Sequence, residues 1–132
     1  MNYVWIPIIL FWIFFSLDLY KTRKGILPDA SNEGNPLARY LYQKTPPWLN
    51  NLVHILYLFA VTVLALLSGR IGLWIGYSAF VGHFTGFLSW TRLNKWPGAT
   101  KRSKWIFPMM FVVVLTIGYL LSTLHEYVWI GQ

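Results

Sequence analysis

Few side chains in this sequence can carry chemistry, and most of them lie in or near one stretch. Three of the four acidic residues, Asp18 and Glu33 among them, fall between residues 18 and 42. His54 and His83 lie inside long apolar segments, where an ionisable group is a candidate functional residue by default. Carboxylates and imidazoles are used together for general acid–base catalysis and for binding Zn²⁺, Mn²⁺ or Fe²⁺. Asp18, Glu33 and His83 are therefore the candidate catalytic residues and a candidate ligand set for a divalent transition metal.

The two carboxylates also have structural interpretations. Asp18 is expected in the last turn of the first apolar segment, where it could be a hydrated interfacial group paired with Lys21. Against that interpretation, a carboxylate near a helix C-terminus meets the unfavourable end of the helix dipole. Glu33 could be an ordinary solvated loop acid. The sequence leaves both alternatives open.

Small residues form a stripe on the third apolar segment, residues 71–91. At 100° per residue, one narrow face contains Gly72, Gly76, Ala79, His83, Gly86 and Trp90. Small residues at this spacing let membrane helices approach closely, so the stripe predicts a packing face that points His83 toward protein. The structural alternative for His83 is a neutral ring that hydrogen-bonds across helices, to Thr62 or Thr116.

Further polar residues are candidates for binding a ligand. They are Asn35, Arg39, His54 and Arg92. The two arginines would hold phosphate, as guanidinium groups commonly do. Asn35 followed by Pro36 is also a strong helix start, since asparagine caps and proline fits the first helical position. The sequence therefore predicts a short amphipathic helix over residues 36–44, beside a polar pocket that faces the cytoplasm.

Composition predicts that membrane-spanning helices position these residues. The chain is 56% hydrophobic and only 11% charged, against about 25% charged in soluble domains. Four apolar segments, at about residues 3–20, 48–68, 71–92 and 105–125, are long enough to cross a bilayer. The first has neither a basic start nor a small-residue cleavage site, which argues against a cleaved signal peptide. The predicted fold is an all-α single transmembrane domain over residues 1–132, with four spanning helices and one interfacial helix.

The distribution of cations predicts how the chain crosses a cell membrane. Ten of the 11 Lys and Arg residues lie in two places: between the first and second segments, and around the connection between the third and fourth segments. Only Arg70 lies elsewhere. By the positive-inside rule, loops 21–47 and 93–104 are cytoplasmic and both termini are outside. His125 and Glu126 then lie at the outer end, where we expect a surface pair. Because topology explains the net charge of +7, anionic lipid headgroups are the expected partner and nucleic acid is not.

The pattern Asp18, Thr22, Glu33, Asn35 and Pro36 resembles a group of small, uncharacterised four-helix integral membrane proteins of archaea and bacteria. Those proteins have an Asp at the end of the first helix and Glu-x-Asn-Pro in the next loop. The resemblance covers about residues 15–42. It implies a four-helix membrane fold in which Asp18, Glu33, Asn35 and Pro36 act together. It implies no particular activity.

Several functions are compatible with these observations. The absence of cysteine excludes thiolate catalysis and Cys-ligated metal clusters. The lack of a closed catalytic motif favours a subunit or accessory protein of a membrane complex, or a small homo-oligomer. A membrane-embedded enzyme on a lipid-linked substrate and a small proton-coupled transporter are alternatives. Haem ligation by His54 and His83 is a further one.

Overall fold

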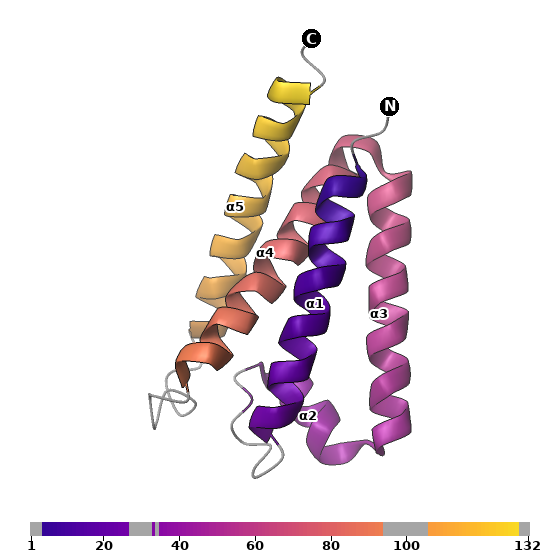
Figure 1. Cartoon of the computed structure of the whole chain (residues 1–132), viewed down its shortest axis with the longest axis vertical. Coiled ribbons are helices and arrows are strands. Elements are labelled where there is room, and N and C mark those ends of the chain that lie inside the picture. The colour runs from indigo at the N-terminus through magenta and orange to yellow at the C-terminus, as the bar shows by residue number, and fades with distance from the viewer. Residues whose placement is uncertain (1–3, 27–32, 34, 94–105, 130–132) are drawn as a thin grey trace.

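All regular structure in the described residues is helical. The structure, a computed structural model, describes residues 4–26, 33, 35–93 and 106–129, with side chains at all of them except 25, 26, 90–93, 106 and 107. Five helices follow one another, α1 (Trp5–Ile26), α2 (Pro36–Lys44), α3 (Pro47–Leu67), α4 (Gly69–Leu93) and α5 (Ile106–Trp129), as Figure 1 shows. No strand occurs in the described ranges. The predicted all-α fold is confirmed.

Four of the helices are long and apolar enough to cross a membrane. The candidate spans are Trp5–Lys24, Pro47–Leu67, Gly69–Ser89 and Pro108–Trp129. Their lengths of 20, 21, 21 and 22 residues match the roughly 20 residues that a hydrocarbon core requires. The arrangement of four candidate spans and one short helix is therefore as predicted.

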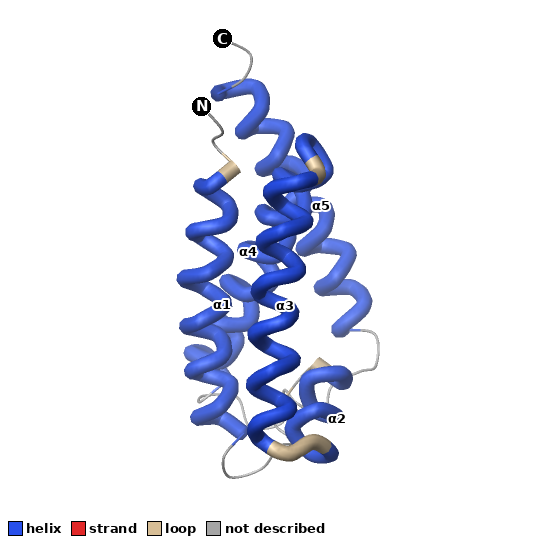
Figure 2. The backbone as a smooth tube through the Cα atoms, turned by 90° about the vertical axis from the view of Figure 1, so that its right-hand side faces the viewer, coloured by secondary structure: helices blue, strands red, loops and turns tan. Residues whose placement is uncertain are grey.

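Both termini lie at one end of the bundle, and α2 lies at the other end (Figure 1). α1 and α4 run toward the α2 end, while α3 and α5 run back from it. In a view turned by 90°, α2 lies beside the N-terminal end of α3 (Figure 2). The last turns of α1 and α4 consequently lie at the same end as α2, and these last turns together with α2 contain six of the 11 cations: Lys21, Arg23, Lys24, Arg39, Lys44 and Arg92.

The first helix is longer than the sequence predicted. α1 continues to Ile26 rather than ending near residue 20. Its last turn contains Arg23 and Lys24, whose positive charge suits the C-terminal end of the helix dipole and whose long stems can reach water. The expectation that Asp18 lies in the last turn is therefore wrong, since about two further turns follow it.

The core lies mainly between α1 and α4. Ile8, Phe11 and Phe15 of α1 are buried, as are Leu73 and Val81 of α4. Large apolar side chains on the other faces of the helices are exposed, which suits a bundle surrounded by lipid.

The small-residue stripe of α4 is a packing face, as predicted. A Cβ atom at Gly76 would lie 3.1 Å from Cβ of Pro7 on α1, and one at Gly72 would collide with the backbone of Ala65 on α3. Because Gly72 and Gly76 have no side chains, α4 can approach both neighbours closely.

A tight hairpin joins α3 to α4. Ser68 ends α3, with its N–H bonded to the carbonyl oxygen of Leu64, and Gly69 begins α4 with φ of 54°. This left-handed backbone conformation favours glycine, because a side chain there meets the following carbonyl. The turn sets α3 and α4 antiparallel.

The short helix α2 begins as the sequence predicted. The Asn35 side chain accepts hydrogen bonds from the N–H groups of Leu37 and Ala38, at 3.0 and 3.3 Å, and Pro36 occupies the first turn. The helix ends at Lys44, and Leu37 and Tyr40 are exposed. These features fit the predicted amphipathic helix at an interface.

α5 packs on α4 through a second close approach. A Cβ atom at Gly118 would lie 2.7 Å from Cα of Ser78. The Trp74 indole N–H also donates to the Leu115 carbonyl oxygen on α5, at 3.0 Å. Gly118 therefore determines how closely the two helices approach.

Replacing Gly118 by alanine should destabilise the bundle. The added methyl meets backbone atoms of Ser78, which cannot move independently, so the cost should be about 1–3 kcal/mol in the free energy of unfolding. Gly82→Ala is the matched control on α4, because its Cβ would lie at an ordinary 3.6 Å from Val114 Cγ1 and should gain up to about 1 kcal/mol of helix propensity. Unfolding in a denaturing detergent, followed by circular dichroism, measures both; equal stability of the two variants would contradict the contact.

Candidate functional site

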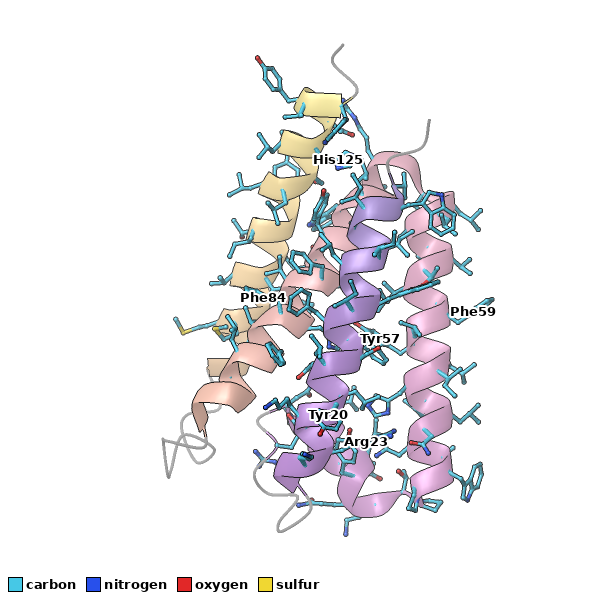
Figure 3. The ribbon with its side chains drawn as sticks, viewed as in Figure 1. Tyr20, Arg23, Tyr57, Phe59, Phe84 and His125 are labelled. Carbon is cyan, nitrogen blue, oxygen red and sulfur yellow. The ribbon has the colours of Figure 1, made fainter. Side chains whose placement is uncertain are left out.

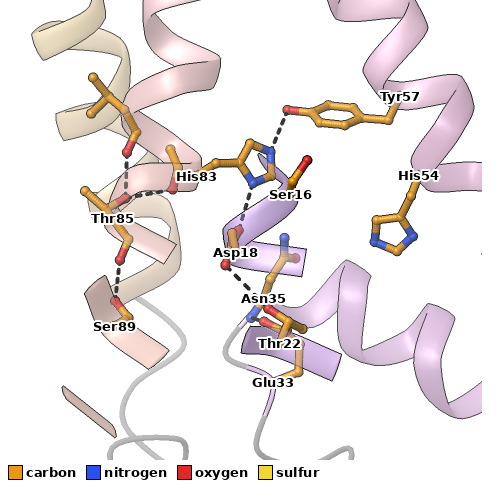
Figure 4. Close-up of polar contacts among 12 residues, drawn as sticks. Ser16, Asp18, Thr22, Glu33, Asn35, His54, Tyr57, His83, Thr85 and Ser89 are labelled. Carbon is orange, nitrogen blue, oxygen red and sulfur yellow. Dashed lines mark hydrogen bonds and ion pairs between the residues drawn. The ribbon is translucent and has the colours of Figure 1, made fainter. Parts of the chain in front are cut away.

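The site is built around a contact between Asp18 of α1 and His83 of α4. His83 Nδ1 lies 2.7 Å from Asp18 Oδ2, and the side chains are 22% and 17% exposed respectively. Because a carboxylate only accepts, Nδ1 carries the proton in this bond. Thr22 Oγ1 lies 3.4 Å from the other carboxylate oxygen, one turn along α1. The two helices thus share one enclosed polar contact (Figure 4).

Gly86 makes room for the Asp18 carboxylate. A Cβ atom at Gly86 would lie 2.7 Å from Oδ2 and 2.8 Å from Oδ1 of Asp18. The carboxylate therefore rests against the bare backbone of α4, one turn after His83. This position belongs to the small-residue stripe, so the stripe serves the polar site as well as the packing.

The second nitrogen of His83 faces α3. His83 Nε2 lies 3.4 Å from the Tyr57 hydroxyl, and Figure 4 shows the ring between Asp18 and Tyr57. The rings of Phe11 and Phe15 pack beside His83, with centroids 5.7 and 5.0 Å away. A carboxylate, an imidazole and a hydroxyl are thus aligned inside an aromatic shell. The expectation that His83 hydrogen-bonds Thr62 or Thr116 is wrong, since its ring nitrogens face Asp18 and Tyr57.

His54 lies closer to the α2 end and faces Tyr42. His54 Nδ1 is 2.7 Å from the Asn50 carbonyl oxygen, so this nitrogen is the donor, and in the neutral ring Nε2 can accept from the Tyr42 hydroxyl at 3.5 Å. Burial and then the nearby charge of Glu33 raise the pKa of Tyr42 to about 12. Tyr42 on α2 therefore stays a neutral phenol over the physiological range.

Glu33 is buried and serves the start of α2. Its Oε1 accepts from the Asn35 N–H at 2.8 Å, and its backbone carbonyl accepts from Arg39 Nε at 2.8 Å. A carboxylate at this position satisfies free N–H groups and suits the positive end of the helix dipole. The interpretation of Glu33 as a solvated loop acid is therefore wrong.

The predicted residues fall into two neighbouring groups. Asp18 and His83 contact each other directly, while Glu33, Asn35 and Arg39 bind one another around the first turn of α2. Arg92 lies in α4, but its side chain is outside those the structure describes.

The described residues do not assemble the predicted metal ligands. Among them, no group of three or more His, Asp and Glu side chains is placed to hold one ion. The carboxylate of Glu33 is turned to the α2 backbone, and the Asp18 and His83 atoms hydrogen-bond each other. Binding of a divalent transition metal by Asp18, Glu33 and His83 stays a prediction, and no chemical step below depends on it.

Two contributors to this region were missed in the sequence. Tyr57 carries no motif, and only its place on the α3 face toward α1 would have indicated a role. Arg23 donates to the Asn51 side chain, which links the ends of α1 and α3 where the sequence indicated only topological charge. Nearer the middle of the bundle, the Trp12 indole donates to Thr62 Oγ1 at 2.9 Å.

A second polar cluster lies at the opposite end of the bundle (Figure 3). His125 is only 4% exposed and its Nδ1 lies 2.8 Å from the Tyr77 hydroxyl. Glu126 pairs instead with Arg70, at 2.8 Å. The expected surface pair of His125 and Glu126 is therefore wrong, because successive residues on α5 point to different neighbours.

Comparison with models of protein families, with curated proteins and with solved structures finds no match to this chain. The resemblance carried by Asp18, Thr22 and the Glu-x-Asn-Pro segment accordingly stays an expectation.

A methyl group at position 86 should separate Asp18 from His83. In Gly86→Ala the carboxylate must move, so we expect the loss of a charge-assisted hydrogen bond, about 1.5–3 kcal/mol in the free energy of unfolding. Unfolding in denaturing detergent measures the loss, with Gly82→Ala as the control on the same helix. In an Asp18→Ala background, Gly86→Ala should cost much less, because the group it displaces is gone. If Gly86→Ala costs as much stability in the Asp18→Ala background as in the natural chain, its effect does not come from displacing Asp18.

Proposed function

We propose that this chain is a small multi-pass membrane protein that works as a subunit or accessory protein of a membrane complex. In this proposal the Asp18–His83–Tyr57 group is its polar working site, open toward the cytoplasm. The observation that carries the proposal is the 2.7 Å contact between Asp18 and His83, a titratable pair retained inside an apolar bundle. Ionisable groups in such surroundings are costly, and they typically mark proton or ligand sites.

The site suits proton exchange better than bond cleavage by a nucleophile. The part of the chain that is described has a carboxylate on one nitrogen of His83 and a phenol near the other, and cysteine is absent from the sequence. The hydroxyl of Ser16, one of two serines labelled in Figure 4, donates to the Trp12 carbonyl oxygen at 2.9 Å. Taking up and releasing a proton is what a carboxylate–imidazole pair can do without further groups.

The outer faces of α3 and α5 support the partner part of the proposal. In the spanning part of each of these helices, only 17% of the residues are buried within the chain. α1 and α4 supply most of the internal core. Two of the four candidate spans thus present nearly whole apolar surfaces to lipid or to another protein.

Photocrosslinking in native membranes should detect that partner. Phe59 on α3 and Phe111 on α5 are exposed, so a photoreactive phenylalanine fits each position without disturbing the core. We expect at least one of them to give a discrete protein adduct by mass spectrometry. Phe84 is the matched control, because its ring packs on Phe14 with centroids 4.9 Å apart, and it should give no intermolecular adduct.

The adducts decide the composition of the complex. An adduct of twice the chain mass would identify copies of this chain as the partner, and another defined mass would identify a different subunit. Lipid adducts alone at both exposed positions would contradict the subunit proposal.

The orientation we propose places the α2 end in the cytoplasm and both termini outside. It is supported by the cations at the α2 end, among them Lys21, Arg23 and Lys44, and by the positive-inside rule.

Single cysteines should report this orientation, since the natural chain has none. Gln43→Cys at the end of α2 and Tyr127→Cys near the end of α5 are both at exposed positions. In sealed cells, a membrane-impermeant maleimide should label Tyr127→Cys at once, and Gln43→Cys only after permeabilisation. The reverse labelling would contradict the orientation and leave the complex proposal standing.

A membrane-embedded enzyme is the second candidate, favoured by the partial exposure of Tyr57. Its hydroxyl faces His83, so a lipid-linked substrate could approach an acid–base pair from the side of the bundle. Comparing membrane lipids between cells with the natural chain and with His83→Gln separates the candidates: a lipid species that depends on His83 favours the enzyme.

A further inference from the structure

A cavity at the outer end of α4 and α5 lies apart from the Asp18–His83 site. It has a volume of about 160 Å³ and is lined by Tyr77, Leu121, Leu124, His125, Val128 and Trp129. Tyr77 and His125 are 8% and 4% exposed, and their polar atoms meet at 2.8 Å. Neither residue takes part in the function proposed above.

The cavity opens sideways, toward the lipid-facing surface. Leu124, Val128 and Trp129 are 57%, 44% and 48% exposed, whereas the Tyr77–His125 pair forms the buried wall. The Arg70–Glu126 ion pair, in which Arg70 is highly exposed, marks the nearby aqueous boundary. A molecule would therefore enter from the bilayer, with its polar end close to the membrane surface.

Volume limits the occupant to one ring with an apolar tail outside. An engineered cavity of about 150 Å³ in another protein holds benzene, whereas sites for whole drug-sized ligands measure roughly 300–1,000 Å³. The leucine, valine and tryptophan walls favour an apolar body. Only part of a lipid-soluble molecule is thus enclosed.

The buried wall favours an oxygen on that ring. A tyrosine hydroxyl both donates and accepts, so the Tyr77 hydroxyl can bond a second oxygen beside its contact with His125. Apolar pockets with a few convergent polar groups are typical of small-molecule sites.

We propose that this cavity binds a membrane-soluble molecule whose head is a single oxygen-bearing six-membered ring, an alkylated phenol or quinone. Leu121, Leu124 and Val128 contact the ring and the start of its tail. Tyr77 hydrogen-bonds its oxygen. The site is independent of the Asp18–His83 pair.

Methyl resonances can test the site in the intact chain. With the protein in phosphatidylcholine nanodiscs, 4-decylphenol and a decyl-substituted benzoquinone are added at increasing mole fraction, and decylbenzene is the control without oxygen. We expect saturable ¹³C-methyl shifts at Leu121, Leu124 and Val128 for at least one oxygenated probe. Decylbenzene should bind about tenfold more weakly or not at all, and the stronger of the two oxygenated probes identifies phenol or quinone.

Variants then locate the binding. Leu121→Trp fills the cavity and should abolish saturation, whereas Leu120→Trp, at an exposed neighbouring position, should leave it unchanged. Tyr77→Phe should weaken the oxygenated probe about tenfold and decylbenzene not at all. Shifts that rise linearly with every probe, equal binding of decylbenzene, or unchanged binding in Leu121→Trp would each overturn the proposal; if that variant does not fold, Tyr77→Phe and decylbenzene decide.

Discussion

A carboxylate and an imidazole that meet inside an apolar bundle must satisfy each other, because lipid tails offer no hydrogen bonds. Asp18 and His83 do this across α1 and α4, and their contact constrains both helices. α1 must extend past Asp18, α4 must present a glycine where the carboxylate rests, and α3 must bring a hydroxyl to the other ring nitrogen. The position of Gly86 shows how tightly these requirements are linked, since one methyl there would occupy the place of the carboxylate.

α4 is the helix on which both polar clusters depend. Its half toward α2 contacts α1 through His83, and its other half contacts α5 through Tyr77. Between these levels Phe80 packs on Phe14 of α1, with ring centroids 5.4 Å apart, so an aromatic contact separates the two clusters. Hydrogen bonds between buried polar groups are also directional. They therefore fix the rotation of one helix relative to another, which apolar packing alone does not.

The sequence predicted the elements well because each has a local signal. Span length follows from apolar runs, the start of α2 from Asn35 and Pro36, and the packing face of α4 from its small residues. Which polar groups meet was harder to predict, because this depends on helix rotation and on where α1 ends. Asp18 was expected near the membrane surface, and His125 was expected in water; longer helices and neighbouring residues on different faces place both inside.

The enclosed Asp18–His83 pair is only loosely covered on the side of α3. Described bonds between α1 and α3 are confined to Trp12 with Thr62 and Arg23 with Asn51, at different levels along the helices, and Tyr57 between those levels is partly exposed. α3 is tied more closely to α4, through the short turn at Gly69 and the bare backbone of Gly72. Because the Tyr57 hydroxyl is 3.4 Å from His83, a small rotation of α3 would make or break this bond while leaving the bond to Asp18 in place. A partner helix that packs on α3 would therefore change the Tyr57–His83 contact. In this way the apolar outer face of α3 is connected to the Asp18–His83 pair, the only titratable pair that bridges α1 and α4 among the described residues.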